Sequence, residues 1–293
     1  MKIITLDNGI LKVEISTLGA EVVNVEKDGV KKIWDGKEEI WKGHSPILFP
    51  ICSCLLDGYY EYKGKKYNLK PHGFAKKMEF EVVSEEKTSA TFLLSPNDET
   101  KEVYPFEFGF KAHFKLEDDK LCVYYIVENK GNEPMYYNVG CHEAYMLNGN
   151  MTDYSILFEG EDKIYNTIYG DNGLEQDKLE IELKDNKLNL SLDYFVGEFT
   201  HKGVKFDKDS IVIENVKNKR LTLLKGEEVE AELYFADFDH LVIWTCDNGF
   251  IAIEPWNGLP DFSNSNHKIE DKKSISKLDG NSTKTYYHSI IFN

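Results

Sequence analysis

The chain has 293 residues, of which 41% are hydrophobic and 29% are charged, an ordinary composition for a soluble globular protein. Acidic residues outnumber basic ones by 51 to 35, so the formal net charge is −16. This balance argues against nucleic acid and anionic membrane surfaces as partners, because both select basic patches. No stretch approaches the roughly 18 apolar residues of a membrane span, and Asp7 and Asn8 interrupt the N-terminus too early for a signal sequence.

The five cysteines are odd in number and contain no C-x-x-C spacing. Reduced thiols in a cytoplasmic protein are the simplest interpretation. Cys52 and Cys54 could contact a soft metal, but no Cys/His set at zinc spacing completes such a site, so we expect no metal. The sequence also contains no dinucleotide-binding fingerprint and no P-loop, and we expect no cofactor.

The predicted elements, taken in chain order, are short strands separated by clusters of Asp, Asn, Gly and Lys. In the first half they cover residues 10–15, 21–25, 32–34, 59–69 (a hairpin around Gly64), 78–83, 89–94, 108–116 and 120–129. In the second half they cover residues 155–158, 179–183, 210–214, 220–224, 230–235, 241–244, 250–253 and 285–292. Single helical turns are expected within residues 97–104 and 190–195.

Many short strands with turn signals every 8–12 residues or so favour sheets packed face to face. The sequence contains no linker, low-complexity run or internal repeat that would divide it. We therefore predict an all-β fold, one large antiparallel β-sandwich that forms a single domain over residues 1–293.

Three stretches are polar where a buried strand would not require it. His72 precedes Gly73, which lets the backbone turn, so a loop can present this imidazole. His142 lies just beyond the end of an aromatic strand. Glu254 ends a second apolar strand, and Pro255 follows it with no N–H for a sheet ladder, so we expect regular pairing to stop there.

These residue types suit acid–base chemistry. A lone histidine at a strand end is more often a hydrogen-bonded structural residue, but two histidines and a glutamate at strand ends form a natural proton donor and acceptor set near neutral pH. A buried, unpaired carboxylate is costly, so Glu254 is either paired or a base with a tuned pKa. Phe74, Tyr145 and Trp256 are close in sequence to these groups and offer apolar faces for the C–H groups of a sugar.

Six short motifs carry a resemblance to a known family. They are Leu18-Gly19-Ala20-Glu21, Pro46-Ile47-Leu48-Phe49-Pro50, Tyr62-Lys63-Gly64-Lys65-Lys66-Tyr67, His72-Gly73-Phe74-Ala75, Asn138-x-Gly140-x-His142-x-Ala144-Tyr145 and Glu254-Pro255-Trp256. In this order and spacing the chain resembles the aldose 1-epimerases, or galactose mutarotases, over essentially its whole length. The resemblance implies a β-supersandwich that interconverts the α and β anomers of a hexose or related aldose. It also implies a small-molecule sugar as partner, no cofactor, and a monomer or homodimer.

The resemblance also implies roles for individual residues. Glu254 is expected to be the general base that takes the proton from the C1 hydroxyl, and His142 the general acid that protonates the ring oxygen. His72 is expected to hold the substrate and steady charge on that oxygen. For the family aspartate that binds sugar hydroxyls, Asp209 is our candidate and Asp207 the alternative.

Two departures from the family leave other functions open. Cys54 occupies the place of an arginine that binds sugar hydroxyls, and a thiol cannot donate the forked hydrogen bonds of a guanidinium group. One alternative is therefore a carbohydrate-binding or sensing protein without catalysis. Another is an epimerase of hexose phosphates, which needs basic groups at the pocket; Lys76 and Lys77 are the nearest basic pair in the sequence.

Glu143 follows His142 where related sequences often have proline. Neighbouring residues of a strand point to opposite faces, so we do not expect these two side chains to touch. His288 belongs to the last strand pattern and is expected to be a cross-strand or surface residue.

Overall fold

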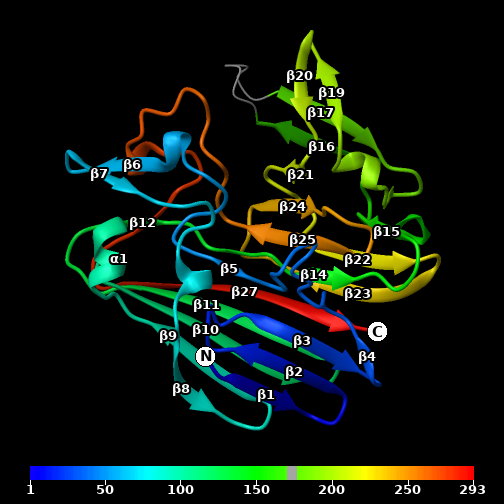
Figure 1. Ribbon diagram of the computed structural model, residues 1–293, viewed down its shortest axis with the longest axis horizontal. Coiled ribbons are helices and arrows are strands. Elements are labelled where there is room, and N and C mark those ends of the chain that lie inside the picture. Colours follow the sequence, from blue (N-terminus) through cyan, green and yellow to red (C-terminus); the bar gives the residue numbers. More distant parts are fainter. Residues whose placement is uncertain (170–176) are drawn as a thin grey trace.

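Antiparallel strands make up most of the computed structural model, which describes residues 1–169 and 177–293 (Figure 1). The largest sheet has nine strands in the order β18 (Lys187–Asn189), β15 (Tyr154–Leu157), β22 (Arg220–Lys225), β23 (Glu228–Tyr234), β27 (Ser282–Phe292), β11 (Lys120–Asn129), β10 (Phe108–Glu117), β9 (Ser89–Leu94) and β8 (Glu81–Glu85). A six-stranded sheet has the order β21 (Ser210–Ile213), β24 (His240–Trp244), β25 (Phe250–Trp256), β13 (Gly140–Cys141) and β5 (Ile47–Leu48), with β14 (Ala144–Met146) also paired to β25.

Smaller sheets surround these two. The N-terminal sheet contains β1 (Ile3–Asp7), β2 (Leu11–Ser16), β3 (Val22–Lys27) and β4 (Val30–Lys31). The two-stranded sheets are β6 (Tyr59–Tyr62) with β7 (Lys65–Asn68), β12 (Met135–Tyr137) with β26 (Ser276–Leu278), β16 (Lys163–Ile168) with β17 (Asp177–Glu182), and β19 (Glu198–His201) with β20 (Val204–Asp207). Figure 1 places β16, β17, β19 and β20 together at one end of the molecule.

The two large sheets pack face to face through aromatic side chains. Phe49, next to β5, stacks on Phe110 of β10 with 4.4 Å between ring centroids. Tyr145 of β14 meets Phe292 of β27 at 6.4 Å. Burying one such aromatic side chain stabilises the folded protein by about 1.5–3 kcal/mol. Because the side chains of a strand alternate between its two faces, every second residue points into this core. The predicted antiparallel β-sandwich is confirmed.

The helical segments are short. Helix α1 (Asp98–Val103) begins at Asn97, whose side chain accepts a hydrogen bond from the N–H of Thr100 in a capping box. The 3₁₀ turns are η1 (Leu56–Gly58), η2 (Ala75–Lys77), η3 (Met151–Asp153), η4 (Leu192–Tyr194) and η5 (Ile269–Asp271). The two helical turns predicted from sequence correspond to α1 and η4. Within the described ranges, no helix is both long enough and apolar enough to cross a membrane.

Two local predictions are wrong. The strand predicted at residues 32–34 is reduced to a single bridge between Ile33 and Tyr145. Regular pairing also does not stop at Pro255. The proline stands opposite Leu241, and β25 continues to Trp256, which is opposite both His240 and Gly140. Glu254 is therefore held inside a paired strand and not at its free end.

Candidate functional site

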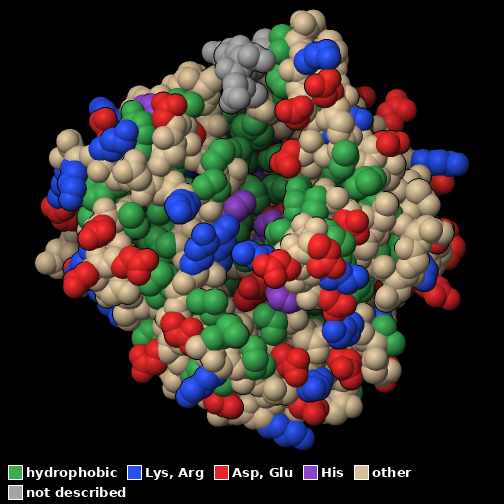
Figure 2. Space-filling view, in the orientation of Figure 1, with side chains coloured by type: hydrophobic (Ala, Val, Ile, Leu, Met, Phe, Trp, Pro, Cys, Tyr) green, Lys and Arg blue, Asp and Glu red, His purple; other side chains and the backbone are tan. Residues whose placement is uncertain are grey.

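A cavity of about 860 Å³ opens beside the six-stranded sheet. Figure 2 shows it as a hollow near the centre of this face, with histidine side chains inside and lysine or arginine side chains next to them. Five of the seven predicted site residues line it: His72, His142, Asp209, Glu254 and Trp256. They come from segments far apart in the sequence, which the antiparallel sheet and its loops bring together.

Glu254 lies on β25, opposite Val242 of β24, and is only 1% exposed. Its Oε1 atom is 3.4 Å from Nε2 of His142, and its Oε2 atom has no hydrogen-bond partner among the described residues. Burial raises the pKa of this carboxyl group well above its usual range, and the charge of Glu143 acts in the same direction. Glu254 lines the cavity, and its unpartnered oxygen leaves the carboxyl group able to make one more hydrogen bond.

His142 lies between β13 and β14 and is enclosed by two tryptophans. Trp41 stacks on the imidazole at 4.9 Å, and Trp244 meets it edge-on at 5.4 Å. Burial lowers the pKa of His142 well below its usual value, and the neighbouring His72 and Lys76 add to this effect. Because burial favours the uncharged form of both His142 and Glu254, we describe their contact as a carboxyl–imidazole pair that shares one proton.

His72 is fixed by its own backbone as well as by its ring. Its N–H donates to the carbonyl of Ser53 at 2.7 Å, and the N–H of Ser53 donates to Nδ1 of His72 at 3.1 Å. Burial, and then the charge of Lys76, lowers the pKa of His72 to about 3, so the ring is neutral. Since Nδ1 accepts a hydrogen bond, the ring proton resides on Nε2, which is a donor.

Two glycines of the motifs make room for these side chains. Gly73 has a φ of +68°, and a Cβ atom there would come within 2.2 Å of the carbonyl oxygen of Phe49. At Gly140 a Cβ atom would come within 2.8 Å of the ring of Trp256. This ring meets His72 edge-on at 5.5 Å, and its Nε1–H donates to the carbonyl of Cys141. Both motifs therefore need glycine for close packing around the cavity.

Phe74 and Tyr145 do not line the cavity, which corrects their prediction as sugar-binding residues. Phe74 packs against Phe49 and Tyr104 in the aromatic core. Tyr145 is 2% exposed in β14, opposite Ile251. Side chains three positions apart in extended backbone face opposite sides, so the alternation that sends His142 into the cavity sends Tyr145 into the core.

Of the two candidate aspartates, Asp209 lines the cavity and Asp207 does not. Sequence reasoning missed Glu21, Trp41 and Trp244 as lining residues. Glu21 belongs to one of the six motifs, and its Oε1 accepts hydrogen bonds from the N–H groups of residues 44 and 45 at 2.7 and 3.0 Å. Trp41 lies in an irregular loop whose sequence carries no strand or helix pattern.

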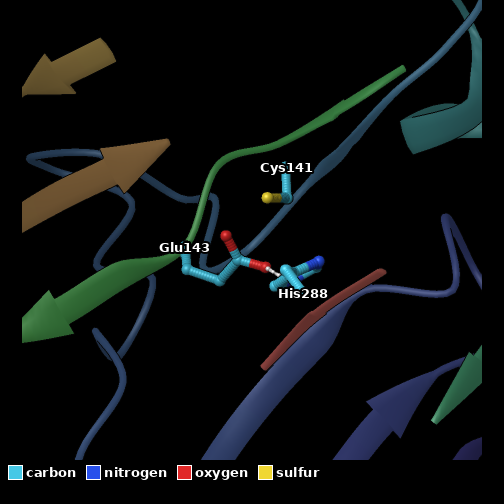
Figure 3. A group of neighbouring side chains, drawn as sticks. All are labelled: Cys141, Glu143 and His288. Carbon is cyan, nitrogen blue, oxygen red and sulfur yellow. Dashed lines mark hydrogen bonds and ion pairs between the residues drawn. The ribbon is translucent and has the colours of Figure 1, made fainter. Parts of the chain in front are cut away.

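Glu143 points away from the cavity, as expected, into the space between the sheets. Figure 3 shows one of its oxygens directed to His288 and the other toward Cys141. The Glu143 carboxylate and Nε2 of His288 are 2.8 Å apart, and His288 is buried on β27, not at the surface. The ligand atoms of the three side chains lie within 4.8 Å of one another, the one such set with metal-binding residue types in the described part of the chain. One oxygen of Glu143 is therefore occupied by its hydrogen bond with His288, which links the two sheets inside the protein.

The chain is similar to known proteins over most of its length. The family model for aldose 1-epimerase matches residues 2–273. The chain belongs to the aldose 1-epimerase family. It is 30% identical to the plasmid-encoded protein LacX of Lactococcus lactis over 94% of both chains. Its structure is similar to that of the galactose mutarotase related enzyme from Lactobacillus acidophilus, with a TM-score of 0.88 and 28% sequence identity. This match covers 100% of this chain and 97% of that chain. A galactose mutarotase-like protein from Lactobacillus casei shares the fold, with a TM-score of 0.87, 24% identity and all of both chains covered.

Within this aldose 1-epimerase fold, Cys54 lies at the cavity wall beside Ser53 and His72. Its side chain is exposed, and the Ser53 hydroxyl is 3.8 Å from its sulfur. A thiol cannot donate the forked hydrogen bonds of a guanidinium group, and the other polar side chains that line the cavity include the acceptors Asp209 and Glu21 and the donor His72.

Proposed function

We propose that this protein interconverts the α and β anomers of an aldose, with Glu254 as general base and His142 as general acid. The observation that carries this proposal is the 3.4 Å approach of His142 Nε2 to Glu254 Oε1 in the wall of a cavity. Two proton-transfer groups at this separation can serve two oxygens of one sugar, the C1 hydroxyl and the ring oxygen, which are bonded to the same carbon.

In the proposed reaction the charged form of the pair reacts. The Glu254 carboxylate takes the proton from the C1 hydroxyl while the His142 imidazolium protonates the ring oxygen. The C1–O5 bond breaks, and the products are an open-chain aldehyde, a neutral carboxyl group and a neutral imidazole. Burial favours this neutral pair, so the environment of the site assists ring opening. Rotation about C1–C2 and the reverse transfers close the ring as the other anomer.

The neighbouring side chains have supporting roles in this proposal. The Nε2–H of His72 donates to the ring oxygen as it gains electron density. Asp209 and Glu21 accept hydrogen bonds from sugar hydroxyls, and the faces of Trp41 and Trp256 cover sugar C–H groups.

Exchange NMR on equilibrated D-glucose and D-galactose tests this proposal. Cross-peaks between the C1 protons of the two anomers are expected to grow faster with the protein present. His142→Ala is expected to abolish this gain, whereas His113→Ala, outside the cavity lining, is expected to retain it. No enhanced exchange for any aldose with the wild-type protein counts against the proposal.

Cys54 favours one second candidate, a sugar-binding protein without catalysis, because it replaces the arginine expected at this wall. Trp41, Trp244 and Trp256 line the cavity and report on its occupation through fluorescence. Saturable quenching by a sugar together with unaltered anomer exchange supports this candidate, and enhanced exchange rules it out.

A further inference from the structure

Three lysines, Lys42, Lys76 and Lys77, line the same cavity as the carboxyl–imidazole pair. None of the three ammonium groups forms an ion pair or a hydrogen bond with any residue of the described chain. The protein carries a net charge of −16, so acidic partners are abundant on its surface. Lys42 and Lys77 are exposed and Lys76 is half-buried, and this group of unpaired cations around one cavity of an acidic protein is a specific local feature.

Two of these cations also repel each other. Lys76 is half-buried, and its pKa is lowered first by burial and next by the charge of Lys77. A like charge beside a partly desolvated ammonium group is unfavourable, and a bound anion would offset this repulsion. The acidic groups of Glu21 and Glu254 act on the pKa of Lys76 in the opposite direction, but neither forms an ion pair with it.

The backbone holds Lys76 and Lys77 near the reacting groups. Both belong to η2, which directly follows the His72 loop, and the N–H groups of Phe74 and Ala75 both donate to the carbonyl of Phe49. The charge of Lys76 lowers the pKa of both His72 and His142, so its ammonium group is within electrostatic reach of the carboxyl–imidazole pair. A sugar that reacts at Glu254 extends into this field.

We infer that the aldose taken by this cavity carries an anionic group, a phosphate monoester or a carboxylate, bound by Lys76 and Lys77 with Lys42. The inference rests on the proposed function for the reacting end of the sugar. A phosphate monoester offers two negative charges and three acceptor oxygens, and lysines bind phosphate as point charges. The cavity volume of about 860 Å³ leaves room for such a substituent beyond the sugar ring.

Ligands that cannot change anomer separate this inference from catalysis. Calorimetric titration compares 1,5-anhydro-D-glucitol 6-phosphate, which has no anomeric hydroxyl, with neutral 1,5-anhydro-D-glucitol. The phosphate is expected to bind at least tenfold more tightly at low salt, and the preference is expected to shrink as salt screens the charges. Methyl α-D-galactopyranosiduronate is the carboxylate arm and decides which anion is preferred.

The double variant Lys76→Gln/Lys77→Gln is expected to lose the preference for the anionic ligand. The matched control is Lys65→Gln/Lys66→Gln, an adjacent exposed pair on the β6–β7 hairpin outside the cavity lining, which is expected to keep it. Equal binding of charged and neutral ligands, or a preference that survives in Lys76→Gln/Lys77→Gln, overturns the inference. An anion preference without anomer exchange leaves it standing and refutes the proposed function instead.

Discussion

Replacing Gly73 with alanine tests how the backbone places His72 in the cavity. With φ at +68°, any L side chain costs about 1–2 kcal/mol here. The new Cβ would also lie 2.2 Å from the Phe49 carbonyl oxygen and 2.6 Å from the nitrogen of Pro50. These are backbone atoms and cannot rotate away, so overpacking adds about 1–3 kcal/mol. The free energy of unfolding is expected to fall by about 2–5 kcal/mol.

Gly64 provides the control because it shares the backbone conformation without the crowding. Its φ is +73°, and an added Cβ has no atom within 4 Å. In Gly64→Ala the free energy of unfolding is expected to fall only by the cost of the left-handed backbone conformation, about 1–2 kcal/mol. Urea unfolding at equilibrium measures both variants, with a shifted midpoint and an unchanged slope. Equal losses for the two variants would refute the reasoning, because the close approach to Phe49 would then have no cost.

Three further predictions concern the buried charges and the thiols. Glu254→Gln is expected to raise the melting temperature at pH 7–8 but not near pH 4. Burial raises the pKa of Glu254 in the folded protein. The wild-type protein therefore loses stability as the pH rises from about 4.3, the pKa of an unfolded Glu, toward that folded-state pKa. Equal melting curves at both pH values contradict this. Glu143→Gln removes a charge that raises the pKa of Glu254, so the acidic limb of the kcat/KM profile is expected to move to lower pH; a limb that stays in place argues against this coupling. Iodoacetamide is expected to label the exposed Cys54 and Cys246 and to spare the three buried cysteines, and a bound sugar is expected to protect Cys54 alone in peptide mass spectra. Labelling of Cys54 that a saturating sugar does not slow argues against its place in the binding site.

Alternation of apolar and polar residues was enough to predict most of the sandwich. The strands β10, β11 and β27 have long, regular patterns, and their predicted bounds agree with the structure within a few residues. The polar hairpin of β19 and β20 was missed, because its residues are mostly exposed or only half-buried and include few apolar positions. Such strands are specified by pairing with each other and leave little hydrophobic signal.

Only those site residues that belong to the sequence motifs could be predicted. His72, His142 and Glu254 are separated by long stretches of chain, and no local pattern states that they meet; the family resemblance supplied that expectation. Trp41 had no signal because a loop residue is positioned by the groups it packs on, here His142 and Phe250. The error at Tyr145 was avoidable, since strand parity relative to His142 places it on the opposite face.

The most direct test of the account is polarimetry of freshly dissolved α-D-glucose, α-D-galactose and their 6-phosphates with the wild-type protein and Glu254→Gln. General-base catalysis typically contributes about 10²–10⁴-fold, and Gln keeps the shape of Glu254 but cannot accept the proton. We predict that the wild-type protein speeds the approach to anomeric equilibrium for at least one of these sugars and that Glu254→Gln loses at least a hundredfold in rate. A wild-type rate equal to the spontaneous one for every sugar, or an undiminished rate in Glu254→Gln, would contradict the central claim.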